Sequence, residues 1–358
     1  MQLIDRIARV PSVELSEPPA VEAAIAETVR YLDSSAALRS LELDTYWPKW
    51  NSPWWHMLLL WELGLAERIP ARVVRAMVDG LDALPVKIFP IHPGELPPGM
   101  DPYRETSCHC ALGTMGQVLR ACGIDVEREL PWAGTTWFGR YQMADGGLSC
   151  DNDAYLVAHE HPSSMVGTVS PLEAMLDHTP QRIRVAARPG KAGACDGEIT
   201  AARETFVDRA ASFLVERRLT QGSSTVHNAE ERTRAPEWLR PTFPRFYLYD
   251  VIRGLHALTR WAQLRRREIP ASAIESVVTH LVATCPDGVV RVERQAFEPM
   301  TTRVHDAATN TWIREPASHF PLLDATSRLG EPSPALTRQW QDARRGLLAL
   351  HDAKLIAA

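Results

Sequence analysis

The chain lacks the short motifs that mark several large enzyme classes. It has no Gly-x-Ser-x-Gly nucleophile elbow, no phosphate loop and no dinucleotide fingerprint, and its 12 histidines form no His-Glu-x-x-His array. Each of these motifs places a nucleophile, a phosphate or a metal ion by a defined local geometry. The sequence therefore gives no indication of an α/β-hydrolase, a P-loop enzyme, a Rossmann-type dehydrogenase or a zincin.

Long apolar runs and an excess of positive charge are also missing. No segment approaches the roughly 18 apolar residues that a membrane-spanning helix needs, and the first residues have no apolar signal core. The net charge of −5 and the pI of about 6.2 argue against a nucleic-acid partner. The 6 cysteines show no regular disulfide framework. We expect a cytoplasmic protein whose partner is a small molecule, and the oligomeric state is not indicated.

Five segments are almost purely apolar for about three helical turns. Each starts in a polar or proline-rich loop and stops near a glycine or a charge, and a helix that is apolar all round must be buried. The sequence therefore predicts five inner helices, at Pro53–Gly64, Ser107–Gly123, Ser163–Leu176, Tyr247–Leu258 and His319–Leu329.

Four other segments have apolar residues at spacings of three and four with charges between them, which is typical of surface helices. A last amphipathic helix is expected over Pro334–Leu355, packed back on the rest. The four outer helices are predicted at Pro19–Leu32, Ala71–Leu84, Ile199–Leu219 and Ala271–Cys285.

Alternating outer and inner helices predict a single all-α domain over residues 1–358, an α/α toroid of five to six helical hairpins around a central cavity. Long connections separate the later helices, at 178–198, 220–246 and 286–318. Connections of this length are unusual in compact domains and tend to be functional. No strand hairpin is expected, although short extended pieces at Arg182–Ala187 and Val289–Glu293 are possible.

Several pieces resemble the prenyltransferase and squalene-cyclase repeat superfamily. Its repeats carry a Gln-x-x-Asp-Gly-Gly-Trp turn before an apolar inner helix, and Gln142–Leu148 matches this turn with Leu148 in place of the tryptophan. Short bacterial toroid proteins of this superfamily are similar over roughly residues 30–330. The matching pieces, in order, are Trp47–Trp50, Glu105–Cys110, Gly146–Cys150, Ser163–Ser164 and Phe243–Arg253.

The resemblance implies a terpenoid cyclase-like or prenyltransferase-like enzyme that acts on an apolar or isoprenoid-like molecule, by acid-initiated cyclisation or group transfer. This chain departs from the pattern in two respects. Val166 and Leu248 stand where the bacterial group has histidines, and the strict Asp-x-Asp-Asp motif of the cyclases is missing.

Cysteines are the residues best placed to hold a cofactor. Cys108 and Cys110 fall at an expected helix N-terminus, which lowers the pKa of a thiol, and Cys150 lies in the loop feeding the next helix. Zinc prefers thiolate and imidazole ligands. We predict a zinc site from Cys110 and Cys150 completed by Cys108 or by a nearby histidine, His159 or His161, of which His161 is preferred. The alternative is that these cysteines are small buried hydrophobes.

Acids and aromatics complete the candidate site. The catalytic candidates are Asp250, Asp151, Asp153 and Tyr249, with Asp250 either a buried proton donor or the partner of Arg253 in a structural ion pair. Aromatic faces stabilise carbocations, although large rings also fill helix interfaces. The substrate-binding candidates are Trp50, Trp54, Trp55, Cys108, His109, Tyr247 and Arg253.

Two other functions stay open at this point. A carbohydrate-active (α/α) barrel would need two carboxylates across a groove, and a non-catalytic toroid would bind a ligand or a protein partner. A deep cavity lined by tryptophan and leucine favours the cyclase-like enzyme. An open acidic groove favours the carbohydrate enzyme, and a filled centre favours the non-catalytic toroid.

Overall fold

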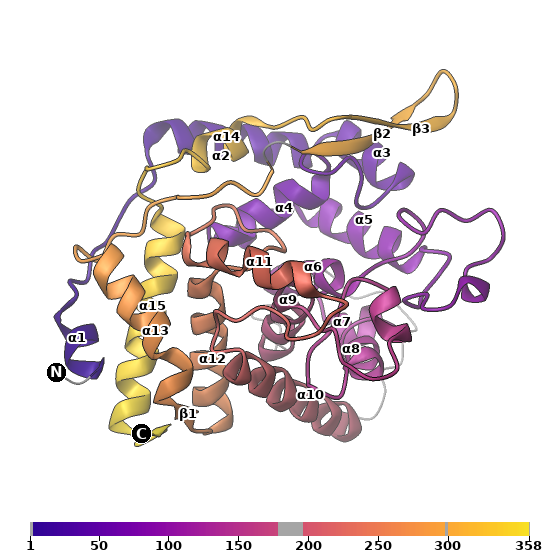
Figure 1. Cartoon of the computed structure of the whole chain (residues 1–358). Helices are drawn as coiled ribbons and strands as arrows, with labels where there is room; N and C mark the ends of the chain where they lie inside the picture. The colour runs from indigo at the N-terminus through magenta and orange to yellow at the C-terminus, as the bar shows by residue number, and fades with distance from the viewer. Residues whose placement is uncertain (1–2, 178–195, 298–299, 358) are drawn as a thin grey trace.

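The computed structural model describes residues 3–177, 196–297 and 300–357. These residues are mostly helical, as expected for an all-α chain (Figure 1). Within them, no helix is both long enough and apolar enough to cross a membrane. The extended piece expected at Arg182–Ala187 and the sixth cysteine, Cys195, lie outside the described residues.

The apolar segments form the buried helices of the molecule. Helices α4 (Pro53–Glu62), α6 (His109–Ala121) and α9 (Met165–Leu176) are buried almost throughout, and α12 (Val251–Arg265) is buried over most of its length. Along the chain, α4 packs on α6, α6 on α9 and α9 on α12. Four of the five predicted inner helices are therefore confirmed as buried helices.

The amphipathic segments also form helices close to the expected bounds. These are α2 (Pro19–Leu32), α5 (Ala71–Asp82), α10 (Asp196–Glu216) and α13 (Ala271–Thr284). In α5 the predicted apolar stripe is buried, and the last of its residues, Leu84, lies beyond the helix and is half-buried. Five short helices have no counterpart in the prediction: α1 (Leu3–Arg9), α3 (Ser35–Leu43), α7 (Val126–Glu129), α8 (Thr135–Tyr141) and α11 (Ala229–Arg234).

The fifth predicted inner helix differs from the expectation. Helix α14 (Pro321–Thr326) is only 6 residues long and packs on α2, whereas α15 (Pro334–Asp352) takes the place beside α12. The apolar run after Pro321 is short, and polar residues follow it up to Gly330, so a longer buried helix cannot form. The predicted stripe of α15, which includes Trp340 and Leu347, is buried.

The expectation of no strand hairpin was wrong. Strands β2 (Thr301–Asp306) and β3 (Thr311–Pro316) form an antiparallel hairpin with Val304 opposite Ile313, and it projects from the body in Figure 1. Strand β3 is exposed along nearly its whole length and β2 is mostly half-buried, so no alternation of apolar and polar residues predicts the hairpin. Strands β1 (Ile269–Pro270) and β4 (Ile356–Ala357) form a short parallel pair. Val289–Glu293 forms no strand, and only Arg291 makes an isolated bridge, to Pro332.

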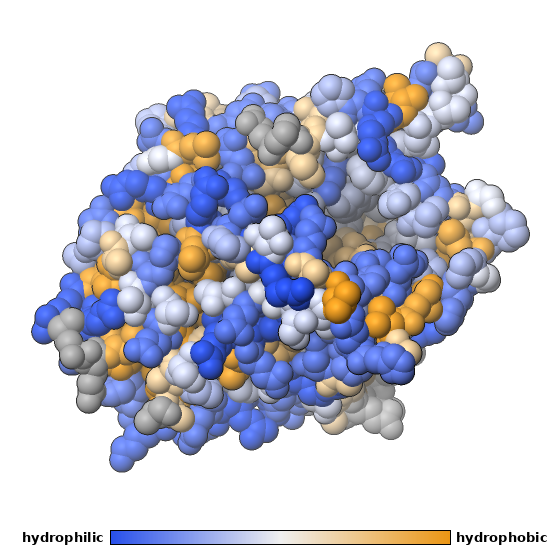
Figure 2. Space-filling model, viewed as in Figure 1, coloured by the Kyte–Doolittle hydropathy of each residue, from blue (hydrophilic) through white to orange (hydrophobic). Residues whose placement is uncertain are grey.

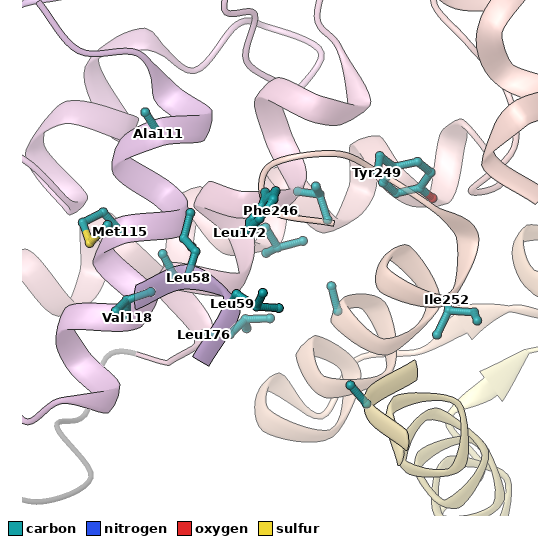
Figure 3. Packing of buried hydrophobic residues seen from close by; sticks show 14 of the residues in the cluster. Leu58, Leu59, Ala111, Met115, Val118, Leu172, Leu176, Phe246, Tyr249 and Ile252 are labelled. Carbon is teal, nitrogen blue, oxygen red and sulfur yellow. The ribbon is translucent and has the colours of Figure 1, made fainter. Parts of the chain in front are cut away.

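Side chains fill the space between the buried helices. Leu58 of α4, Met115 of α6 and Leu172 of α9 belong to one apolar cluster with Phe246 (Figure 3). The best-formed pockets of the described residues include none that is lined by α9 or α12. None of these pockets is therefore the expected cavity between the four inner helices.

Candidate functional site

Three cysteine side chains meet at the N-terminal end of α6. The Sγ atoms of Cys108, Cys110 and Cys150 all lie within 4.8 Å of one another, and those of Cys108 and Cys110 are 3.4 Å apart. The backbone N–H of Cys110 donates to Cys150 Sγ at 3.4 Å. We call this group the thiol cluster. The predicted meeting of Cys110 with Cys150 is thus observed, and the third member is Cys108 rather than a histidine.

A tight turn brings Cys150 to the helix. In the Gln142–Leu148 segment, Gly146 has φ +88°, and a Cβ there would lie 2.3 Å from Arg209 O, so only glycine fits. The Asp145 carboxylate accepts hydrogen bonds from Gly147 N and from Ser163 Oγ. Leu148 then pairs with Ser164 in an isolated bridge just before α9. The Asp-Gly-Gly turn singled out in the sequence therefore fixes the loop that carries Cys150.

Hydrogen bonds within the thiol cluster shift the pKa values of its three cysteines in opposite directions. Hydrogen bonds with the thiols of Cys110 and Cys150 lower the pKa of Cys108 well below its ordinary value. The same hydrogen bonds, together with burial, raise the pKa of Cys110 and of Cys150. Cys108 also occupies the N-cap position of α6, where the helix dipole favours an anion. Cys108 is therefore the first thiol of the cluster to ionise.

A pocket of about 430 Å³ opens beside the thiol cluster. Figure 2 shows this face hollowed below the projecting hairpin. The pocket lies at the N-terminal ends of α4 and α6 and beside the C-terminal end of α5, so it is at the rim of the helical body and not at its centre. Its lining is Thr45, Tyr46, Trp47, Lys49, Trp54, Leu81, Leu84, Phe89, Pro90, Pro102, Tyr103, Arg104, Thr106, Ser107, Cys108, Ala111, Cys150 and Asn152.

Lys49 is one of several lining residues that sequence reasoning missed. Its Nζ donates to Tyr247 Oη at 2.6 Å and lies 4.8 Å from the centre of the Trp50 ring. Burial lowers the pKa of Lys49, and the nearby Cys110 and Cys108 oppose this shift. The residue stands inside the Trp47–Trp50 piece on which the family resemblance partly rests, but no role was assigned to it from that motif.

His109 is connected to the loop that carries Cys150 through hydrogen bonds of Tyr155. Trp137 Nε1 donates to His109 Nδ1 at 2.8 Å, and His109 Nε2 lies 2.9 Å from Tyr155 Oη. The same Tyr155 oxygen accepts from the backbone N–H of Ser149, next to Cys150. Burial lowers the pKa of His109 to about 4, so the ring is neutral at pH 7. His109 is fully buried and outside the pocket lining, although it was expected to bind substrate.

The acid expected to donate a proton lies elsewhere. Asp250 is the N-cap of α12, and its carboxylate accepts from Arg253 N at 2.9 Å and from Thr242 N at 3.1 Å. The guanidinium of Arg253 does not pair with Asp250 but with Glu173, at 2.6 Å. Tyr249 donates its hydroxyl to Leu219 O. These residues are buried, and none of them lines the pocket.

The remaining predicted residues divide between the pocket and its surroundings. Trp54 and Cys108 line the pocket, whereas Trp50 and Trp55 pack against each other at 4.8 Å beneath it. Asp151 is exposed and lies 2.7 Å from the ring of His227. Asp153 and His161 are exposed, and His161 is not part of the thiol cluster.

The donor set fits a zinc ion. Tetrahedral zinc with Zn–S bonds of about 2.3 Å places its sulfur ligands about 3.8 Å apart. The separations within the thiol cluster agree with that spacing, and Cys108 already has a lowered pKa. Three protein ligands leave one position for water or substrate, as in catalytic zinc sites.

Comparison with protein-family models, with curated proteins and with solved structures gives no significant match.

Proposed function

We propose that the protein is an enzyme that binds an apolar or isoprenoid-like small molecule in the rim pocket and transfers a group at a zinc ion held by Cys108, Cys110 and Cys150. The observation that carries this proposal is the convergence of three thiols beside a pocket of about 430 Å³. When bound, zinc would supply a nucleophile by deprotonating a thiol or water at its open position.

The chain's own residues give the pocket its preference for apolar ligands. Aromatic rings of Tyr46, Trp47, Trp54, Phe89 and Tyr103 line it. Such rings exclude water, and their faces attract positive charge by roughly 0.5–2 kcal/mol each. The resemblance to the prenyltransferase and squalene-cyclase superfamily points to the same class of ligand. Of its two reaction types, the geometry supports group transfer, because Asp250 is engaged as a helix cap away from the pocket.

The order of the helix contacts supports the toroid arrangement that we propose for the fold. The buried helices follow one another as α4, α6, α9, α12 and α15, each in contact with the next. Outer helices are interleaved with them along the chain, as a ring of helical hairpins requires. The carbohydrate alternative has less support, because no aspartate or glutamate is among the described residues that line the pocket.

Metal analysis of the purified protein tests the proposal. We expect about one zinc ion per chain in protein kept under reducing conditions, and its loss in the Cys110→Ser variant. Cys285→Ser is the matched control, because Cys285 is also free and buried but lies outside the thiol cluster. Native mass spectrometry of protein from its own host would show a small apolar ligand as well. Protein that neither retains zinc nor rebinds it would refute the metal centre.

A further inference from the structure

Lys49 is a cation of the rim pocket that has no carboxylate partner among the described residues. The pocket lining has two cations, and the other one, Arg104, pairs with Asp44 at 3.3 Å. Among the described residues no carboxylate forms an ion pair with Lys49, and its ammonium donates to the hydroxyl of Tyr247. The anionic groups near it are the thiols of the cluster, whose charge a bound zinc ion would largely offset, and a half-buried ammonium is then stabilised by a further anion. The position therefore favours a ligand that brings a negative charge.

The ammonium is held in place from several sides. Lys49 Nζ lies 4.6 Å from the centre of the Tyr247 ring, and the backbone N–H of Lys49 donates to Thr302 Oγ1 of the hairpin at 2.6 Å. The next residue, Trp50, adopts φ 75°, which is unusual for a bulky side chain and costs of order 1–3 kcal/mol. Strain of this kind is common where a side chain is held for function.

A second unmet donor lines the same pocket. Trp54 is only 1% exposed, and its Nε1–H has no acceptor among the described residues. Trp54 is also among the lining residues. A buried indole N–H ordinarily finds a partner. The pocket thus offers a cation and hydrogen-bond donors. Its lining has no carboxylate that would repel an anionic ligand.

We propose that Lys49 binds an oxyanion of the substrate, so that the ligand is an apolar or aromatic molecule bearing a carboxylate or a phosphate. This inference deepens the proposed function and rests on it only in taking the rim pocket as the substrate site. It makes the ligand amphipathic, with its apolar body among the aromatic rings and its charged end at Lys49.

Three probes that share one ring system test this assignment: 2-naphthoate, 2-naphthyl phosphate and the neutral 2-naphthalenemethanol. Isothermal titration calorimetry on the full chain should show at least one anion binding about tenfold or more tightly than the alcohol, since a hydrogen bond to a charged group contributes about 1.5–3 kcal/mol. The anion whose affinity exceeds that of the alcohol by more identifies the charged group of the natural ligand as a carboxylate or a phosphate. Equal affinity for all three probes would overturn the proposal.

Variants separate Lys49 from the metal ion, which also attracts oxyanions. Lys49→Met should abolish the preference for anions, and Lys49→Arg should keep part of it. Lys87→Met is the matched control, because Lys87 is exposed, pairs with Asp82 and does not line the pocket. A preference that persists in Lys49→Met refutes the role of Lys49.

The zinc-free Cys110→Ser variant keeps the two proposals apart. Retention of the anion preference in this variant is expected if Lys49 is the anchor, and it holds whether or not the wild-type protein binds zinc. Loss of the preference in Cys110→Ser, with circular dichroism showing a folded chain, would assign the anion to the metal ion and overturn the inference. Zinc content is measured for each variant, so that a failure of the metal proposal is recorded separately.

Discussion

At the scale of single residues, burial of titratable groups decides how the fold responds to pH. His56 lies in α4, is 4% exposed and stacks on Phe320 with ring centres 3.6 Å apart. Burial lowers its pKa to about 3. His256, on α12, also has a pKa lowered to about 3 by burial. Both rings are neutral in the folded protein at pH values where the unfolded chain is protonated.

His56 therefore makes the protein less stable in acid. Because unfolding takes up a proton at this ring between about pH 6.5 and pH 3, the free energy of unfolding falls as pH falls, by up to about 1.4 kcal/mol per pH unit. His56→Phe keeps a ring against Phe320 and should flatten that slope by about this amount. Urea unfolding at several pH values between 6.5 and 4.5, with chelator present throughout, measures it.

An exposed histidine provides the control. His351, near the end of α15, is exposed, and His351→Gln should leave the slope unchanged. An unaltered slope in His56→Phe would mean that the ring is solvated, and protonated near its ordinary pKa, in the folded state.

From the local sequence, an interaction between two residues could be predicted mainly where the two residues are close along the chain. The spacing of Asp250 and Arg253 suggested an ion pair, and the two residues do interact, but through the backbone N–H of Arg253. Its guanidinium reaches Glu173, 80 residues away along the chain. Similarly, Cys110 and Cys150 were expected to meet, whereas Lys49 carried no signal, because a lone lysine is ordinarily a solvated surface residue.

At the scale of elements, α6 and α9 pack closely beneath the site. A Cβ on Gly113 would be 2.6 Å from Pro171 N and 2.6 Å from Ser170 C, and both of these are backbone atoms that cannot rotate away. The glycine thus allows the two helices to approach, and it sets the depth at which the N-terminus of α6 presents its cysteines.

Gly113→Ala should destabilise the protein by about 1–3 kcal/mol, because the added methyl group overpacks the contact. The matched control is Gly139→Ala in α8, where a Cβ meets nothing within 4 Å. That change should be neutral or stabilise by about 0.5–1 kcal/mol, since alanine costs less backbone entropy in a helix. Urea unfolding compares the two variants. A Gly113→Ala chain as stable as wild type would show that α6 and α9 can move apart without cost.

Helices were the most predictable level of this structure. Apolar periodicity placed nine of the expected helices close to their observed bounds, because a stripe or a shell of apolar residues has one stable way to be buried. The hairpin was missed because neither of its faces is buried enough to require an alternating apolar pattern. The truncated α14 was missed because periodicity does not reveal which of two helices, α14 or α15, packs beside α12.

At the scale of the whole molecule, the pocket joins parts of the chain that are remote in sequence. Its lining comes from residues 45–54, 81–90, 102–111 and 150–152. The hairpin touches this wall from near the other end of the chain, since Arg303 pairs with Asp101 at 2.9 Å. The sequence predicted a cavity among the buried helices. Its actual place at the rim depends on how these loops meet, which helix periodicity cannot report.

Hairpin contacts hold one wall of the pocket in place. The guanidinium of Arg104 lies 3.9 Å from the centre of the Trp312 ring in β3. A cation–π contact between partly exposed groups contributes about 0.5–1 kcal/mol. Removal of that ring should therefore loosen the wall locally, because few buried contacts elsewhere depend on the hairpin.

Trp312→Ala should weaken binding of 2-naphthoate about two- to fivefold and speed hydrogen exchange of the amides in residues 101–107, with little change in the free energy of unfolding. Ile313→Ala is the matched control, because Ile313 is the next residue of the same strand, is 41% exposed and has its side chain on the opposite face. It should leave both measurements unchanged. If neither affinity nor exchange responds to Trp312→Ala, the wall is held by the helical body alone, and the hairpin contributes nothing to the pocket.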